Sequence, residues 1–129
     1  MINREVVFRG KDIDTKEWVY GDLVQQNSIV IISRPSSVDF YTRIKVRVDS
    51  STLGQYVNRV DKNNVRIFEG DYIKVKHGRI CLVYWNDDAM TWDLKVVVDN
   101  KDCRPPDSWD LWYPGNLEVV GNQYDTKIA

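Results

Sequence analysis

The sequence predicts an all-β protein. Short apolar or alternating segments recur along the chain, turn-forming Gly, Asn, Asp and Pro residues separate them, and few segments show helical periodicity. The length of 129 residues suits one compact domain, or two small β units that share a core, and five Trp, seven Tyr and three Phe can bury a large area. We therefore expect a single domain with a stable core that needs neither metals nor disulfides.

Roughly the first 50 residues are expected to form the N-terminal strands. The first strand is predicted at Val6–Phe8, and a polar turn containing Asp12–Lys16 leads to the second at Trp18–Val24. The continuous apolar run Ser28–Ile32 is typical of a strand covered on both faces, and Ser33–Ser37 is expected to end it.

The segment 51–69 is expected to cross between two sets of strands. Within it, Ser51–Tyr56 fits either one helical turn or an irregular path, and Asp61–Asn64 fits a tight turn. Four or five short antiparallel strands then follow in meander order over residues 70–124, which favours an SH3-like small barrel in the C-terminal part, with the N-terminal strands packed beside it. The expected strands are Asp71–Lys76, Arg79–Trp85, Thr91–Val98 and Leu117–Gln123, with a two-residue turn at His77–Gly78 and another turn at Asn86–Ala89.

Charge, cysteine positions and apolar runs indicate the class of protein and its compartment. The net charge of -1 is unlike that of a general nucleic-acid coat protein, which is usually basic. Cys81 lies in an apolar run and is expected to be a buried small hydrophobe, whereas Cys103 lies in a polar loop and is expected to be exposed. No signal peptide or membrane-length apolar run is visible, so we expect a cytoplasmic protein of a bacterial host.

A basic strand face is the best nucleic-acid candidate in the sequence. Residues 43–48 alternate, so Ile44, Val46 and Val48 are expected to face inward. The candidate contacts on the outward face are Tyr41, Arg43, Lys45 and Arg47. Successive cations on one strand face lie about 7 Å apart, which roughly matches phosphate spacing, and Tyr41 offers a ring for base stacking. The alternative is an exposed edge that is guarded by charge.

The remaining polar groups fit structural roles better than catalytic ones. A second basic group, made of Lys74, Lys76, His77 and Arg79, is typical of a solvated hairpin tip. Asp87, Asp88 and Asp93 could bind a divalent cation, but Asn86–Ala89 is more simply a turn. In Glu69-Gly70-Asp71, the glycine is expected to permit a positive φ and Asp71 to bond turn amides. With no nucleophile, metal or phosphate-binding motif found, we expect no enzyme and no cofactor.

The segment 109–114 is unusually aromatic for a loop and is the best protein-contact candidate. Its proposed contact residues are Trp109, Trp112 and Tyr113, since exposed Trp and Tyr are typical interface anchors. The alternative is a lid that closes the barrel core.

An ordered set of short motifs spans the chain from end to end. It runs R-x-x-x-F-R-G-K, E-W-V-Y-G, G-Q-Y, D-K-N, I-x-E-G-D-x-I and E-V-x-G-N-x-Y. This set resembles the YopX family of phage and prophage proteins. The matching positions are Arg4, Phe8, Arg9, Gly10, Lys11, Glu17, Trp18, Val19, Tyr20, Gly21, Gly54, Gln55, Tyr56, Asp61, Lys62, Asn63, Ile67, Glu69, Gly70, Asp71, Ile73, Glu118, Val119, Gly121, Asn122 and Tyr124.

The chain departs from the family pattern at two turns. Val57-Asn58 stands where members commonly have Thr-Gly, and Asn64 stands where they commonly have Gly. The resemblance implies an SH3-like β architecture and no established activity, cofactor or catalytic residue. The resulting hypothesis is a phage or prophage accessory protein that acts through protein contacts, including self-association, with weak nucleic-acid binding as the alternative. No membrane partner is expected.

Overall fold

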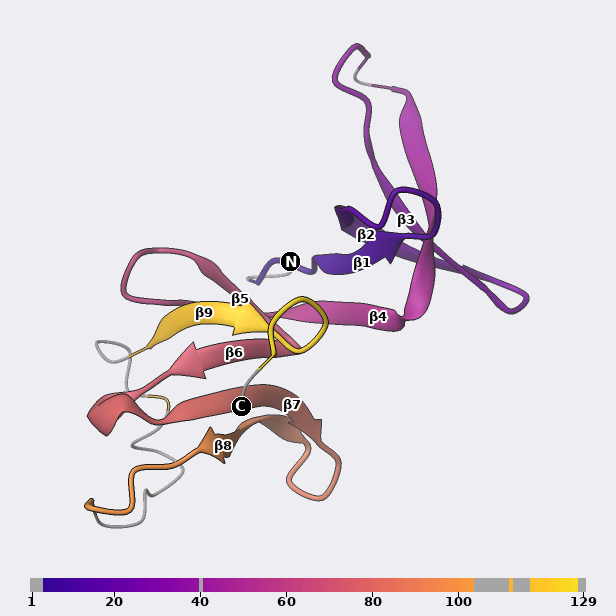
Figure 1. Cartoon of the computed structure of the whole chain (residues 1–129). Helices are drawn as coiled ribbons and strands as arrows, with labels where there is room; N and C mark the ends of the chain where they lie inside the picture. The colour runs from indigo at the N-terminus through magenta and orange to yellow at the C-terminus, as the bar shows by residue number, and fades with distance from the viewer. Residues whose placement is uncertain (1–3, 40, 104–111, 113–116, 128–129) are drawn as a thin grey trace. The chain divides into compact units, whose positions relative to one another are not determined.

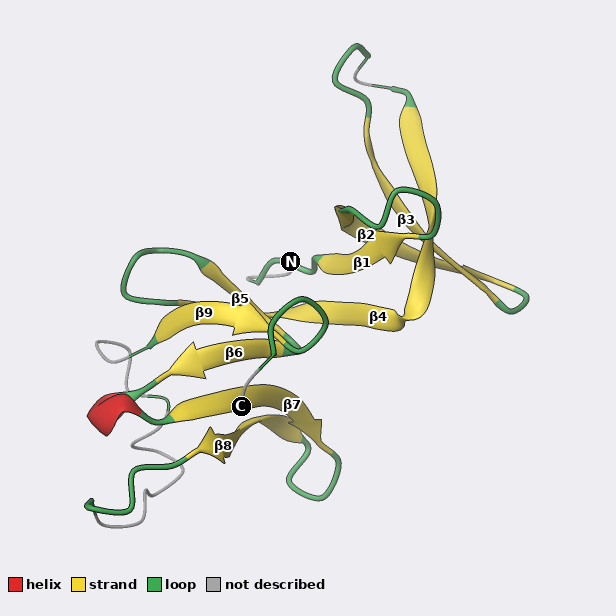
Figure 2. Ribbon diagram, viewed as in Figure 1, coloured by secondary structure: helices red, strands yellow, loops and turns green. Residues whose placement is uncertain are grey.

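The computed structural model describes residues 4–39, 41–103, 112 and 117–127, and in this part the chain is all-β (Figure 2). The chain divides into two compact units, residues 1–56 and 57–129. Its strands form one five-stranded and one four-stranded antiparallel sheet (Figure 1). The strand bounds are β1 Phe8–Asp12, β2 Trp18–Gln26, β3 Ile29–Pro35, β4 Arg43–Val60, β5 Arg66–Phe68, β6 Asp71–Lys74, β7 Ile80–Asn86, β8 Thr91–Val98 and β9 Glu118–Asn122.

The first unit is a ring of strand pairings. β1, β2, β3 and β4 pair in sequence order, and β1 also pairs with β4. β2 pairs with β1 up to Gly21 and with β3 from Asp22 onward, so two partners share this strand. β4 is likewise shared, because it pairs with β3 through Arg47 and with β1 from Val48.

Two local features allow the strands of the first unit to approach closely. A Cβ at Gly10 would lie 2.7 Å from Val48 Cγ2, and a Cβ at Gly21 would collide with the carbonyl oxygen of Ser33. The β1–β4 register shifts between Arg9 and Lys11. At this irregularity the Thr52 hydroxyl accepts a hydrogen bond from the Lys11 amide at 2.9 Å and thereby takes the place of a ladder acceptor.

The second unit contains the larger apolar core. Its four-stranded sheet has the order β8-β7-β6-β9, so the last strand returns beside the first strand of the meander. The buried core residues are Val57, Ile67, Ile73, Val75, Cys81, Val83, Leu94 and Leu117. Asp61 fixes the turn before β5, because its carboxylate accepts hydrogen bonds from the amides of Asn63, Val65 and Val119.

Most of the strands expected from the sequence are present, with several corrections. β1 begins at Phe8 rather than at Val6, and β3 continues to Pro35, past the predicted break. Ser51–Tyr56 forms neither a helical turn nor an irregular crossing but continues β4. The β6–β7 connection is a three-residue 3₁₀ turn, Lys76–Gly78, rather than a two-residue turn.

Coverage of β3 is also less complete than its apolar sequence suggests. Ile32 is fully buried, but Ile29, Val30 and Ile31 are only half-buried. The prediction of a strand covered on both faces therefore holds for Ile32 alone. A further element that the sequence did not indicate is β5, which is only three residues long.

Candidate functional site

A hollow of about 440 Å³ opens in the second unit. The end of β4, the β7–β8 turn, the start of β8 and Trp112 contribute its walls. The lining residues are Val57, Arg59, Ala89, Thr91, Trp92, Asp93 and Trp112. Its volume is in the range of pockets that accept a small ligand or several protein side-chain groups.

Arg59 and Trp112 form one wall of the hollow. The guanidinium carbon of Arg59 lies 5.1 Å from the centre of the Trp112 ring, and its Nη1 donates a hydrogen bond to the Trp112 carbonyl oxygen at 3.4 Å. This is a cation–π arrangement in which the polar contact also fixes the guanidinium. Arg59 is exposed, so its other N–H groups can donate to an acceptor on a partner.

Trp92 and Asp93, on β8, form another part of the lining. Trp92 is half-buried against the core and meets Trp85 edge to face, with ring centres 5.1 Å apart. Asp93 Oδ1 accepts the Leu94 backbone amide hydrogen at 2.8 Å, and Oδ2 accepts a hydrogen bond from the Asn86 side-chain Nδ2 at 3.2 Å. Since these carboxylate oxygens are engaged locally, the hollow offers mainly aromatic faces and one guanidinium.

The predicted aromatic contact is only partly described by the structure. Trp112 lines the hollow and also packs partly against the core, whereas Trp109 and Tyr113 lie outside the described residues. Sequence reasoning missed Arg59 and Trp92 as members of the site. Trp92 could have been noticed as a large aromatic on the inward face of a strand, but no sequence signal links Arg59 to a tryptophan 53 residues further along the chain.

The basic strand face is present, but one of its cations is engaged. Arg43, Lys45 and Arg47 are exposed on β4, while Ile44, Val46 and Val48 alternate with them as less exposed residues, as predicted. Arg43 Nη2 lies 2.6 Å from Asp22 Oδ2 and also donates to the Ser33 carbonyl oxygen.

Tyr41 does not extend this strand face. It lies two residues before the start of β4, in a turn where its amide donates to Asp39 Oδ1, and its side chain is 92% exposed. The exposed cations of the ladder that carry no ion pair in the described part of the chain are Lys45 and Arg47. Arg43, Lys45 and Arg47 therefore share the strand face and Tyr41 lies outside it, while the nucleic-acid contact itself stays a prediction.

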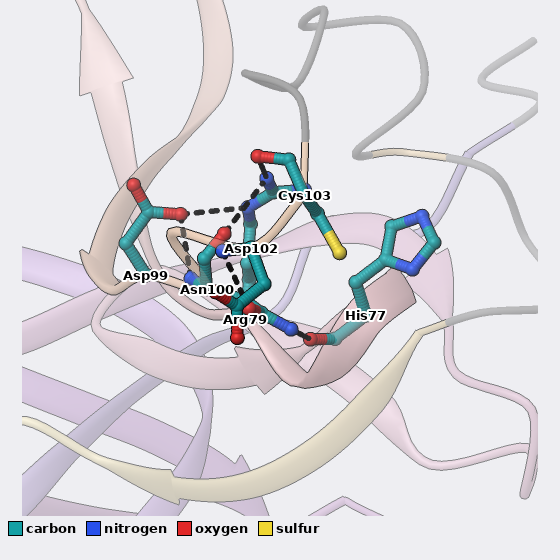
Figure 3. Close-up of polar contacts among 6 residues, drawn as sticks. All are labelled: His77, Arg79, Asp99, Asn100, Asp102 and Cys103. Carbon is teal, nitrogen blue, oxygen red and sulfur yellow. Dashed lines mark hydrogen bonds and ion pairs between the residues drawn. The ribbon is translucent and has the colours of Figure 1, made fainter.

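The second basic group separates into exposed and buried members. Lys74, Lys76 and His77 are exposed, but Arg79 is only 3% exposed. Figure 3 shows Arg79 surrounded by the loop after β8: its Nε lies 2.8 Å from Asp99 Oδ1, and its Nη2 donates to the Cys103 carbonyl oxygen. The Arg79 hydrogen bond holds the pKa of Asp99 below its ordinary value. Arg79 therefore anchors a loop, and the prediction of a solvated tip is wrong for this residue.

Asp87 and Asp88 lie in the turn that precedes β8. Asn86 Oδ1 accepts the amide hydrogens of Asp88 and Ala89, which fixes the turn expected at this position. Among the residues that the structure describes, no group of three or more His, Cys, Asp or Glu is arranged to hold a metal ion.

The Gly-acid motif before β6 also has the structural role predicted for it. Gly70 has a φ of 91°, and Asp71 Oδ2 accepts the Phe68 amide hydrogen at 2.7 Å. A side chain other than glycine would be strained at that φ. The motif therefore shapes the turn that leads into β6.

Neither cysteine forms a disulfide. Cys81 is fully buried in the core, and burial raises the pKa of its thiol to about 11. Its predicted role as a buried hydrophobe is confirmed. Cys103 is half-buried rather than fully exposed, in the loop that Arg79 anchors.

Comparison with known proteins gives one finding that covers nearly the whole chain. The family model described as YopX protein matches residues 7–127. No curated protein matches the sequence. In the described part of the chain, no helix is long and apolar enough to cross a lipid bilayer.

Proposed function

We propose that this chain, which belongs to the YopX family, is a non-enzymatic protein-interaction module of a phage or prophage and acts in the cytoplasm of a bacterial host. The observation that carries the proposal is the hollow between Arg59, Trp92 and Trp112. Trp and Arg are the residue types that most often anchor protein interfaces, because they combine a large apolar area with directed hydrogen bonds.

The chemistry of the hollow indicates what part of a partner it accepts. Trp92 and Trp112 offer ring faces for an apolar or aromatic side chain. Arg59 offers N–H donors beside them, which suit a carboxylate or a backbone carbonyl of the same partner segment. We therefore expect a partner segment that pairs an apolar side chain with an acidic one.

The strand order of the second unit supports the finer fold assignment. We infer an SH3-like barrel over residues 70–124, because β6, β7 and β8 form a meander and β9 returns beside β6. Small barrels of this class bind ligands on surfaces formed by their strand ends and loops. Self-association is part of the same proposal and would make the mass in solution exceed the 15.1 kDa of one chain.

Capture of partners from a nuclease-treated bacterial lysate tests the hollow. The Arg59→Ala/Trp112→Ala double variant should lose the specific partner that the wild type retains, as read by mass spectrometry. The Lys45→Ala/Arg47→Ala variant is the matched control on the other unit and should retain it. If the partner remains bound to the hollow variant, the proposed binding site is wrong.

Weak nucleic-acid binding is a second candidate, favoured by the two exposed cations Lys45 and Arg47 and by exposed Tyr41. It predicts binding to single-stranded oligonucleotides that weakens with salt, because phosphate contacts release counterions. Replacing Arg43, Lys45 and Arg47 by Ala should then abolish binding. Unchanged binding of the triple variant would exclude this strand face as the site.

A further inference from the structure

In the part of the chain that the structure describes, one edge of the four-stranded sheet has no neighbouring strand. β8 is the terminal strand in the order β8-β7-β6-β9, and it is eight residues long with no proline. Among the described residues, β7 is the one strand that pairs with it. An edge of this kind presents backbone N–H and C=O groups to any strand of suitable register.

The hydrogen bonds identify which residues of β8 face the open side. Val83 lies opposite Leu94, but the Val83 carbonyl oxygen accepts the Gly70 amide hydrogen at 2.9 Å, on the side away from β8. The Val83–Leu94 pair is therefore of the non-hydrogen-bonded type, and the Leu94 backbone groups point outward. The direction of the backbone N–H and C=O groups alternates along a strand. The backbone groups of Trp92 and Val96 therefore also point away from β7.

Side chains of the same strand cover two of these outward groups. Asp93 Oδ1 accepts the Leu94 amide hydrogen at 2.8 Å, and Thr91 Oγ1 donates to the Trp92 carbonyl oxygen at 3.4 Å. These local contacts supply partners that a neighbouring strand would otherwise supply. Exchanging them for a ladder breaks no backbone hydrogen bond to β7, and Asp93 contacts β7 through its other carboxylate oxygen, Oδ2, which accepts hydrogen bonds from the Tyr84 hydroxyl and the Asn86 side-chain amide.

The charges of β8 are complementary to those of a second, antiparallel copy. When Leu94 lies opposite Leu94 of the other copy, Asp93 lies opposite Lys95 and Trp92 lies opposite Val96, in both directions. Lys95 is exposed and has no ion pair in the described part of the chain. Opposite charges and aromatic–β-branched pairs are both favourable across strands.

Other registers lack this match. A shift by one residue sets the outward backbone groups of one copy against the inward groups of the other. A shift by two residues sets Asp93 against Asp93 or Lys95 against Lys95, and directly opposed like charges are destabilising. The β7–β8 register also shifts at Val97, so the regular part of the edge ends after Val96.

We propose that two copies of this chain pair through β8, antiparallel and centred on Leu94, so that their four-stranded sheets become one continuous sheet. The proposal rests on the self-association that is part of the proposed function and names its surface. In this dimer Trp92, Leu94 and Val96 exchange backbone hydrogen bonds with their counterparts, and Asp93 turns from the Leu94 amide to the ammonium of Lys95 in the other copy. The side chains of Trp92, Leu94 and Val96, which lie in or against the apolar core of each copy, then lie beside those of the other copy across the two-fold axis.

Light-scattering mass of two charge variants, alone and mixed, tests this register. Lys95→Glu places two acidic residues on the edge, and Asp93→Lys places two basic ones, so each variant alone should be a monomer of 15.1 kDa. An equimolar mixture should form a heterodimer of twice that mass, because the introduced lysine of one variant then faces the introduced glutamate of the other, and the remaining Lys95 faces the remaining Asp93. The control Lys45→Glu makes the same charge change on an exposed β4 position and should keep the wild-type mass.

Each outcome bears on the proposal. A wild-type chain that stays monomeric at every concentration overturns self-association itself. A wild-type dimer that survives Lys95→Glu, or monomeric variants that fail to combine when mixed, overturns the β8 register while leaving self-association standing. Lys95 does not line the hollow, and partner capture is tested through Arg59 and Trp112, so failure of this surface and failure of the hollow are distinguishable.

Discussion

The two units of the chain bury their strands in different ways. In the second unit, eight buried residues form one apolar cluster around Ile67 and Ile73. In the first unit, glycines bring the backbones together, and Arg9 and Lys11 lie over the Trp18 ring at 4.5 and 5.5 Å. The second unit therefore depends more on hydrophobic burial, and the first depends more on close backbone approach and polar contacts.

The largest expected effect comes from truncating the core of the second unit. Ile73→Ala should lower the free energy of unfolding by about 2–5 kcal/mol, because Ile73 is fully buried in the apolar cluster and its removal leaves a cavity. Chemical denaturation followed by tryptophan fluorescence measures this loss. Ile32→Ala is the matched change at a fully buried position of the first unit and should cost less. An equal or larger loss for Ile32→Ala would contradict the proposed difference between the units.

Close backbone approach in the first unit can be tested at Gly21. Gly21→Ala should cost about 1–3 kcal/mol, because the added Cβ collides with the Ser33 carbonyl oxygen on the neighbouring strand. The control is Gly78→Asn, since Gly78 has a φ of 74° that Asn tolerates and nothing within 4 Å of an added Cβ. Denaturation midpoints that shift equally for both variants would show that β2–β3 spacing does not limit stability.

Asp61 gives the second unit a pH dependence of known sign. Burial raises the pKa of Asp61, but hydrogen bonds from the Val119, Val65 and Asn63 amides outweigh it and hold the pKa below its ordinary value. The stabilisation is therefore complete above the unfolded pKa of about 3.9 and is lost as pH falls through the lower folded value.

The variant Asp61→Asn should lose about 1–2 kcal/mol at neutral pH, because its amide nitrogen cannot accept the Val119 hydrogen. The difference from wild type should shrink in acid. Urea denaturation at several pH values measures both trends. A difference that stays constant down to the lowest pH would assign the loss to packing rather than to the charge.

The smallest effect is expected at the surface ion pair of the first unit. Asp22→Asn should change stability by less than about 1 kcal/mol, because the Arg43 and Asp22 side chains are 39% and 67% exposed and water screens their attraction. Thermal unfolding at low and high salt checks this value. A loss comparable to that of Gly21→Ala would mean that this ion pair between β2 and β4 stabilises the first unit as much as strand spacing does.

Local patterns were sufficient to predict much of the fold. β8 was predicted with its observed bounds, and the inward alternation of Ile44, Val46 and Val48 was also correct. Turns fixed by a single side chain, such as Asn86 and Asp71, were visible because the chemistry of those turns is local. The Ser51–Tyr56 segment was mistaken because its strand character depends on the distant pairing with β1.

The candidate site was harder to predict for the same reason. Arg59 contacts Trp112 only after the chain has folded, and Arg79 looked like a solvated cation because its acceptors lie in a loop more than 20 residues later. The outward direction of the Leu94 amide is inferred from the hydrogen bond that the Gly70 amide donates to the Val83 carbonyl oxygen. Contacts between distant segments, which a linear pattern does not encode, therefore determine the proposed contact surfaces.

Residue-resolved hydrogen exchange of the full chain, dilute and concentrated, tests most directly whether the second unit carries the contact surface. We expect the amides of Trp92, Leu94 and Val96 to gain protection with concentration, while those of Asp93 and Lys95, which face β7, and those of residues 43–47 in the first unit stay unchanged. Protection that appears on residues 43–47 instead, or that is absent from β8 at every concentration, would contradict the account.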